Sequence, residues 1–295
     1  MRVIETKNKQ GFEILNENFL FKYALERKPN PKAYKMHAHA ECEIYYFMSG
    51  RGIFHVEGKD YPLQSGDILI MDNRESHYIE IDPDFPYERC AINFKKDLIR
   101  LIDKEGVLLE ALENRQAGSR NLYRKQDFKN DRYLYYIESV ILDVPDNEIQ
   151  IATNLLSLLS EIRVAFRRGD NQSKHASDTR VSNIIKFIME NLDKPLSLDM
   201  ICDKFYISKP QLCRIFKKSM GSSVWNYITL KRLLKAKSMI ESGIQPTKVY
   251  TECGFFDYSS FYKAYKKHFG YAPAQNETSI DRKKEGNDED YYIDA

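Results

Sequence analysis

The chain has 295 residues, of which 42% are hydrophobic and 13% aromatic, and its formal net charge is +2 at pH 7. This composition is typical of a folded protein of about two domains and excludes a largely disordered chain. Residues 1–10 are polar, and no run approaches the ~18 apolar residues of a membrane span, so we expect a cytoplasmic protein. Five cysteines without a CxxC pair favour reduced thiols over a disulfide framework.

Charge is distributed unevenly along the chain. Residues 178–276 carry 16 Lys and Arg against 8 Asp and Glu, whereas residues 1–177 carry 26 against 28 and residues 277–295 carry 3 against 7. A solvated helical surface is one explanation of the basic segment, and a polyanionic partner is the other. The acidic residues 277–295 are predicted to be a disordered tail.

Residues 12–94 alternate between apolar and polar side chains in short runs that turn residues separate. The runs lie at 42–48, 53–57, 68–71, 78–81 and 87–94. Short strands at this spacing predict an antiparallel sandwich or barrel. Residues 1–96 are therefore expected to form a first, β-rich domain.

Three histidines and one glutamate have a recognisable spacing inside this β-rich region. His37, His39 and Glu43 lie within seven residues, and His77 lies eleven residues after Gly66. The spacing of His37, His39 and Glu43 closely resembles the first motif of the cupin superfamily. The second motif of that superfamily is matched only at Gly66 and His77. The resemblance implies a cupin-like sensor barrel.

In cupin enzymes the positions that correspond to His37, His39, Glu43 and His77 hold a metal ion. Imidazoles and a carboxylate suit a divalent transition metal. However, Asp72 and Arg74 stand where the second motif usually has Pro and Gly, and sensor cupins often keep the histidines without a metal. A metal site, polar contacts to an effector, and structural hydrogen bonds therefore stay open, and no other cofactor is expected. Residue type adds four effector-binding candidates, Tyr34, Arg51, His55 and Arg89.

Between residues 97 and 168 the apolar side chains recur at helical spacing. Three stripes run through residues 98–112, which include Leu101 and Ile102, through residues 133–142, and through residues 149–166, which begin with Ile149. Such stripes are usually buried, but helices appended to a small barrel leave apolar surface uncovered. We expect this extension to contribute to a homodimer interface. The polar residues 169–178 are predicted to be an interdomain linker.

Residues 179–276 have helical periodicity and are predicted to form an all-α domain of seven helices. Ser197 is the expected cap of a short helix that ends at Phe205, and Ser208 is the expected cap of a longer helix that ends at Gly221. Gln211, three residues after Ser208, completes a capping box. A short helix, a tight turn and a longer capped helix together constitute a helix-turn-helix unit.

A second unit follows 49 residues later in the chain. Pro246 opens it, residues 254–256 form its turn, and Asp257 caps a helix that ends at Gly270. The connecting helix over residues 223–242 is expected to bury Trp225. Its roughly twenty residues span about 30 Å, and successive major-groove faces of DNA lie roughly 34 Å apart. Both units are therefore expected to read one continuous site of about two turns.

The two units and the helix between them share one spaced set of capping, apolar, basic and glycine residues. These positions are Ser208, Leu212, Arg214, Phe216, Lys217, Gly221, Tyr227, Arg232, Leu233, Ala236, Gly254, Phe255, Asp257, Phe261, Tyr265, Lys266, Gly270 and Pro273. With this set, residues 181–276 resemble the DNA-binding domain of the AraC/XylS family of bacterial transcription regulators. The resemblance covers nearly the whole domain, and a cupin-like sensor ahead of it is the common architecture of the family. Tyr250, Thr251 and Tyr265 depart from the usual residues in the second unit.

The resemblance implies a sequence-specific DNA-binding regulator that is not an enzyme. The residues implied to face bases are Pro210, Cys213, Arg214, Ser259, Ser260 and Lys263. The residues expected to hold phosphates are Lys209, Lys217, Lys218, Lys266 and Lys267. Arg214 is the best single candidate because a guanidinium binds guanine O6 and N7 bidentately; an internal ion pair with Asp203 is its alternative role.

The expected partners are an operator in double-stranded DNA and a small-molecule effector, with carbohydrates common among the resembling proteins. RNA polymerase is a further partner if the protein is an activator. Two other classes stay open: a metal-dependent cupin oxygenase or isomerase that uses the histidine positions, and an architectural DNA-binding protein that ignores small molecules.

Overall fold

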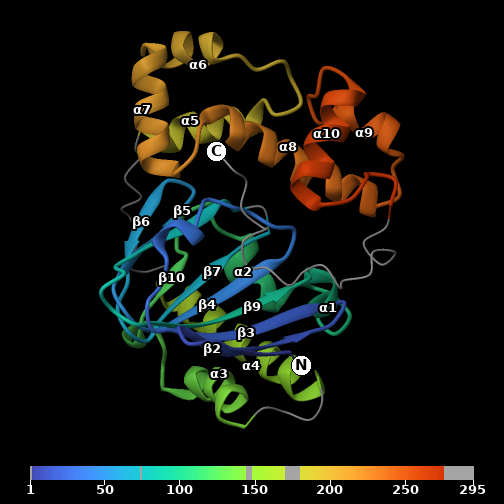
Figure 1. Cartoon of the computed structure of the whole chain (residues 1–295). Coiled ribbons are helices and arrows are strands. Elements are labelled where there is room, and N and C mark those ends of the chain that lie inside the picture. Colours follow the sequence, from blue (N-terminus) through green and yellow to red (C-terminus); the bar gives the residue numbers. More distant parts are fainter. Residues whose placement is uncertain (1, 74, 144–147, 170–179, 276–295) are drawn as a thin grey trace. The chain divides into compact units, whose positions relative to one another are not determined.

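The computed structural model describes residues 2–73, 75–143, 148–169 and 180–275, which form two compact units (Figure 1). One unit is built mainly from the residues before 170 and the other mainly from residues 180–275. Apart from Gly169, the predicted linker 169–178 lies outside the described residues, as does the predicted tail 277–295.

The N-terminal unit contains two sheets, as the strand spacing predicts. The larger sheet has the strand order β1-β2-β3-β9-β4-β7-β10, and the smaller has the order β6-β5-β8. The strand pairs with a resolved register are antiparallel. The strands are β1 (Arg2–Glu5), β2 (Lys9–Leu15), β3 (Phe19–Glu26), β4 (Cys42–Ser49), β5 (Gly52–Val56), β6 (Lys59–Pro62), β7 (Asp67–Met71), β8 (His77–Ile81), β9 (Tyr87–Phe94) and β10 (Leu122–Tyr123).

The two faces of the larger sheet have different partners. Alternate residues of β4 point to opposite faces. Ile44 and Tyr46 belong to the main hydrophobic core, which also contains the buried faces of helices α3 (Arg132–Leu142) and α4 (Glu148–Gly169). Tyr45 lies on the other face, where its ring centroid is 4.8 Å from that of Phe54 on β5. Glu43 shares the face of Tyr45 and therefore points between the two sheets.

The periodicity of the helical extension predicts its burial only in part. Leu101 and Ile102 are exposed, because α1 (Lys96–Arg100) has only five residues and buries Ile99 instead. Ile149, in the first turn of α4, is also exposed. The remaining short elements are η1 (Pro31–Ala33), η2 (Val107–Leu109), α2 (Glu110–Glu113) and η3 (Lys125–Asp127).

Among the described residues, α4 alone is long and apolar enough to cross a membrane by length and composition. The core helix of a globular protein passes the same test. Ile151, Leu155 and Phe166 of α4 are buried in the main core. The packing of α4 is therefore that of a core helix.

Within the N-terminal unit, a buried ion pair joins the loop before β8 to the loop after α2. Arg115 Nη1 donates to Glu75 Oε1 at 2.8 Å, and the two side chains are 1% and 5% exposed. The Glu75 carboxylate also accepts from the backbone N–H of Asp72 at 2.7 Å, from that of Gly118 at 2.7 Å, and from Asn121 Nδ2 at 3.1 Å. Burial by itself raises the pKa of Glu75, but Arg115 and these donors outweigh burial and lower it.

The C-terminal unit consists of six helices within residues 180–275, rather than the seven predicted. They are α5 (Arg180–Glu190), α6 (Leu198–Phe205), α7 (Lys209–Met220), α8 (Val224–Glu241), α9 (Pro246–Glu252) and α10 (Tyr258–Phe269). Trp225 is 52% exposed, contrary to expectation, because Val224, Tyr227 and Ile228 form the buried face of the first turns of α8.

Helix α8 contributes to the hydrophobic cores around both helix-turn-helix units. Its N-terminal half packs with α5, α6 and α7, where Tyr227 lies 5.4 Å from Phe216 between ring centroids. Its C-terminal half contributes Leu233 and Ala236 to the core around α9 and α10. Buried Arg232 donates to the carbonyls of Leu192 and Lys194, each at 2.9 Å, and so ties α8 to the turn after α5.

Candidate nucleic-acid interface and sensor site

The first helix-turn-helix unit consists of α6 and α7, and its caps are those predicted. Ser197 Oγ accepts from the backbone N–H of Met200 at 3.2 Å, and Ser208 Oγ accepts from that of Gln211 at 3.4 Å. The latter is one of the two bonds of the predicted capping box. Gly221 ends α7 at φ +66°, a left-handed conformation that glycine adopts without steric cost.

Helix α7 has one buried apolar face and one exposed face that is mostly basic. Leu212, Phe216 and Met220 are buried. All six predicted DNA-binding side chains of this helix are exposed: Lys209, Pro210, Cys213, Arg214, Lys217 and Lys218. Within residues 180–275, the guanidinium of Arg214 forms no ion pair, so the alternative pairing with Asp203 is not made. The helix therefore presents a basic face with Arg214 at its centre.

Lys209 already has an acidic neighbour on α6. Its Nζ lies 2.7 Å from Asp199 Oδ1, and both side chains are more than half exposed. The hydrogen bond to Asp199 raises the pKa of Lys209, so its charge is retained at neutral pH. A phosphate would have to replace Asp199, which makes Lys209 the weakest of the predicted phosphate contacts on α7.

The second unit consists of α9 and α10, and Asp257 caps α10 as Ser208 caps α7. The carboxylate of Asp257 accepts from the Ser260 backbone N–H at 2.8 Å and from the Ser260 hydroxyl at 2.7 Å, and these bonds lower its pKa. The Ser260 hydroxyl is thus part of the cap, and its proton is engaged by Asp257. The predicted contacts Ser259, Ser260, Lys263, Lys266 and Lys267 are all exposed.

Position 254, the first of the turn in this second unit, accommodates only glycine. Gly254 has φ +79°, and a Cβ built on it would lie 2.2 Å from the Leu192 carbonyl oxygen. The turn therefore approaches the backbone after α5 closely. Phe255, the next residue, packs on Phe261 with ring centroids 5.3 Å apart.

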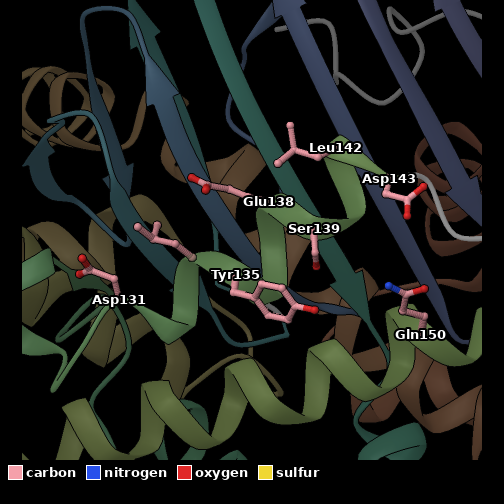
Figure 2. Close-up of a pocket in the computed structure, with 8 residues that line it drawn as sticks. Asp131, Tyr135, Glu138, Ser139, Leu142, Asp143 and Gln150 are labelled. Carbon is pink, nitrogen blue, oxygen red and sulfur yellow. The ribbon is translucent and has the colours of Figure 1, made fainter.

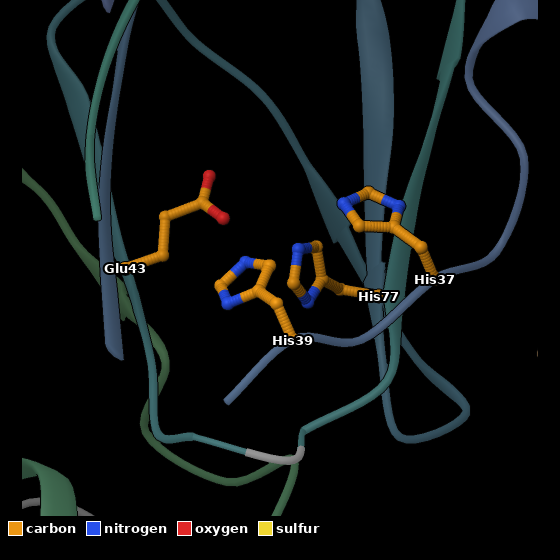
Figure 3. A group of neighbouring side chains, drawn as sticks. All are labelled: His37, His39, Glu43 and His77. Atoms are coloured by element: carbon orange, nitrogen blue, oxygen red, sulfur yellow. The ribbon is translucent and has the colours of Figure 1, made fainter. Parts of the chain in front are cut away.

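The structure brings together all four residues of the predicted cupin-like group (Figure 3). His37 and His77 form an antiparallel bridge, in which each backbone N–H donates to the other carbonyl, at 3.0 and 2.8 Å. His39 follows on the same segment as His37, and Glu43 extends from β4 toward His39 and His77. One ligand atom from each residue lies within 4.8 Å of the others.

Neighbouring groups orient two of these four side chains. His37 Nδ1 lies 3.0 Å from the Lys35 carbonyl oxygen, so Nδ1 carries the proton and Nε2 the lone pair. Asn93 Nδ2 donates to Glu43 Oε2 at 3.3 Å. Asn93 was not predicted from the sequence; it faces Glu43 because the two residues are register partners between β4 and β9.

The other effector candidates are more dispersed. Arg89 pairs with Phe47 in the β4–β9 register and so shares the face of Glu43, and its Nη1 lies 2.9 Å from Glu26 Oε1. His55 points to the opposite face of β5 from Phe54, with Nδ1 2.8 Å from Asp60. The remaining two are Arg51, whose guanidinium lies 3.8 Å over the Phe85 ring, and partly buried Tyr34.

Comparison with known proteins matches both parts of the chain. Residues 23–119 match the model of the AraC-like ligand-binding domain, and residues 201–277 match that of a helix-turn-helix domain. The chain belongs to the AraC family of transcription regulators. This confirms the predicted family and fold class, and this AraC-family protein is a DNA-binding regulator with a ligand-binding domain.

Curated relatives of this AraC-family regulator span most of its length. The HTH-type transcriptional activator RhaS of Escherichia fergusonii is 22% identical over 259 residues, 85% of this chain and 90% of that protein. The raffinose operon transcriptional regulatory protein RafR of Pediococcus pentosaceus is 21% identical over 245 residues, 80% and 84% of the two chains. The oxalate-binding protein of Thermotoga maritima is 42% identical over 59 residues, 20% of this chain and 49% of that one.

Proposed function

We propose that this regulator reads one continuous operator by placing α7 and α10 in successive major-groove segments of one DNA face. The shared helix α8 supports this proposal most strongly, because it packs in the cores of both helix-turn-helix units and so fixes their separation. Its 18 residues span about 27 Å. That length is close to the roughly 34 Å between equivalent groove faces. The exposed residues at the ends of both units add to the distance that the two units span together.

Base reading is assigned chiefly to Arg214 on α7 and to Lys263 on α10. Arg214 can bind guanine bidentately, whereas Lys263 acts as a point donor. Pro210 and Cys213 contribute shape rather than strong hydrogen bonds, and Ser259 and Ser260 tolerate several bases. Exposed lysines on both helices hold phosphates and set affinity and register.

Paired substitutions separate the two roles. The probe is a genomic DNA fragment selected by the wild-type protein, with a scrambled fragment of equal length as its reference. Arg214→Ala should reduce the preference for the selected fragment by about 1–3 kcal/mol. Lys217→Ala should weaken both fragments equally and flatten the salt slope by about one unit. Lys125→Ala, an exposed lysine of the N-terminal unit, is the control; unchanged discrimination in Arg214→Ala would refute base reading.

We also propose that His37, His39, Glu43 and His77 hold a divalent transition metal in the sensor. Three imidazoles and a carboxylate are a suitable donor set. Ligands on opposite sides of such an ion lie about 4.2 Å apart, twice the ~2.1 Å metal–ligand distance. The observed spread of up to 4.8 Å therefore needs side-chain shifts of only a few tenths of an ångström. Because Nδ1 of His37 donates to the Lys35 carbonyl, Nε2 would be the atom of His37 that holds the ion.

When bound, the ion would supply a Lewis acid that attracts oxygen ligands. The effector is then a small oxygen-rich metabolite, either a carbohydrate or a carboxylic acid. The name of the RafR relative supports the former, and that of the short oxalate-binding match supports the latter. Effector binding shifts the population of DNA-binding states, and the chain's own residues carry no catalytic role.

Elemental analysis of the purified full-length protein tests the metal. About one transition-metal ion per chain is expected, with loss of the ion in His39→Ala and Glu43→Gln. His268→Gln, a histidine of α10, is the matched control. A chain that binds no metal after incubation with Mn²⁺, Fe²⁺ or Zn²⁺ would refute the site. Metal-dependent turnover of a sugar or acid would instead favour a cupin enzyme.

A homodimer through α3 and α4 is the proposed assembly, in the cytoplasm, with RNA polymerase as a partner if the protein activates transcription. Tyr135, Leu142 and Ile149 are 66%, 85% and 73% exposed on these helices. Figure 2 shows Tyr135 and Leu142 beside a pocket that also includes Ser139 and Gln150. Analytical ultracentrifugation of Leu142→Glu tests the interface, since a buried charge would shift the protein toward the monomer.

A further inference from the structure

Tyr206, in the turn of the first helix-turn-helix unit, combines two unusual properties. It ends α6 in the left-handed region, at φ +51° and ψ +50°, and it is 95% exposed. A bulky residue is uncommon in this region because its Cβ approaches the following carbonyl. In the second unit the left-handed residue of the turn is Gly254, for which this conformation has no such cost.

Packing does not explain why a tyrosine occupies this position. The neighbouring residue of the turn, Ile207, is the one that joins the core, together with Leu212 and Phe216. Within residues 180–275, the Tyr206 side chain makes no hydrogen bond and no ring contact. The strained residue therefore extends its ring and hydroxyl into solvent, and strain without an internal contact is a feature of functional positions.

The position of Tyr206 indicates the partner. It lies two residues before Ser208, the cap of α7, and three before exposed Lys209. In helix-turn-helix proteins the N-terminal residues of the second helix reach the base edges, so the chain that enters this helix passes the sugar–phosphate backbone. A tyrosine hydroxyl is a common donor of hydrogen bonds to DNA phosphate oxygens. The second turn also presents an aromatic ring, since Phe256 directly precedes the cap Asp257 and is fully exposed.

We propose that Tyr206 is an additional DNA contact, which donates a hydrogen bond from its hydroxyl to a phosphate oxygen and lays its ring along the backbone beside α7. The inference rests on the proposed docking of α7. It assigns Tyr206 to affinity rather than to sequence discrimination, because a phosphate contact carries no base information. A hydroxyl donor displaces no counterion from the DNA, so, unlike the lysine contacts, this contact leaves the salt slope unchanged.

Two variants of the full-length chain test this contact through affinity and stability together. Tyr206→Phe removes only the hydroxyl and should weaken binding to the selected fragment and to the scrambled one by the same factor, about three- to tenfold. Tyr206→Gly should weaken binding at least as much, while the melting temperature of the C-terminal unit stays equal or rises, because glycine relieves the left-handed conformation. Met189→Ala, an exposed apolar side chain of α5, is the control.

The outcomes are distinguishable from a failure of the proposed function. Wild-type affinity in both Tyr206 variants would overturn the contact, and the effect of Arg214→Ala would show independently whether α7 still reads DNA. Should Tyr206→Gly lower both affinity and melting temperature, Tyr206→Phe decides, because it keeps the ring and the backbone conformation. A change in the salt slope of Tyr206→Phe, or a loss confined to one DNA sequence, would also contradict a neutral phosphate contact.

Discussion

Replacement of Glu75 by alanine should strongly destabilise the N-terminal unit. The variant leaves the Arg115 guanidinium, 1% exposed, without its carboxylate partner. Loss of one member of a buried ion pair costs about 3–5 kcal/mol of unfolding free energy. Arg115 still donates to the carbonyls of Ala111 and Ser119, at 2.9 and 3.0 Å, so we expect the lower half of that range.

Differential scanning calorimetry of the full-length protein measures this effect. A loss of about 3–4 kcal/mol from a unit of this size lowers its melting temperature by roughly 6–16 °C. Trp225 is the single tryptophan and lies in the C-terminal unit, so its fluorescence should report an unchanged transition there. Asp131→Ala removes an exposed pair with Lys125 and should cost less than about 1 kcal/mol.

A double variant decides whether the unpaired charge is the cause. Glu75→Ala combined with Arg115→Met should be more stable than Glu75→Ala alone, because no buried charge is then left unpaired. If the double variant is equally or less stable, the reasoning from the ion pair is wrong. The pKa of Glu75 is lowered in the fold, so the stabilisation is complete above the unfolded pKa of about 4.5 and is lost as the pH falls through the folded pKa.

Three further predictions concern the C-terminal unit. Arg232→Met removes two hydrogen bonds to backbone carbonyls and should lower the unfolding free energy by about 1–3 kcal/mol, measured by urea titration of Trp225 fluorescence; a loss below 0.5 kcal/mol would contradict it. Ser208→Ala should cost about 1 kcal/mol in the same titration, and Ser208→Gly only a few tenths; equal losses would argue against the cap. Burial, assisted by Lys237, lowers the pKa of His268 to about 4, so stability should rise with pH between about 4 and 6.5, and His268→Gln should abolish that rise.

Local signals in the sequence identify the DNA-binding unit almost completely. Ser208 and Asp257 cap helices through bonds to residues three positions on, and Gly221 and Gly270 end those helices with left-handed conformations. These interactions lie within a few residues, so the amino-acid pattern alone reveals them. Periodicity fails at Ile102 and the other exposed apolar positions, because burial depends on where a helix ends and on what covers it.

The sequence by itself determined the order of the two domains, the helix-turn-helix units and the basic face of α7. Only the tertiary structure decided that His77 pairs with His37, that Asn93 faces Glu43, and that Glu75 receives Arg115. Each of these contacts joins residues that are 40 to 50 positions apart. Strand register and loop packing set such contacts, and register results from the summed burial of whole strands, which no local pattern at either residue encodes.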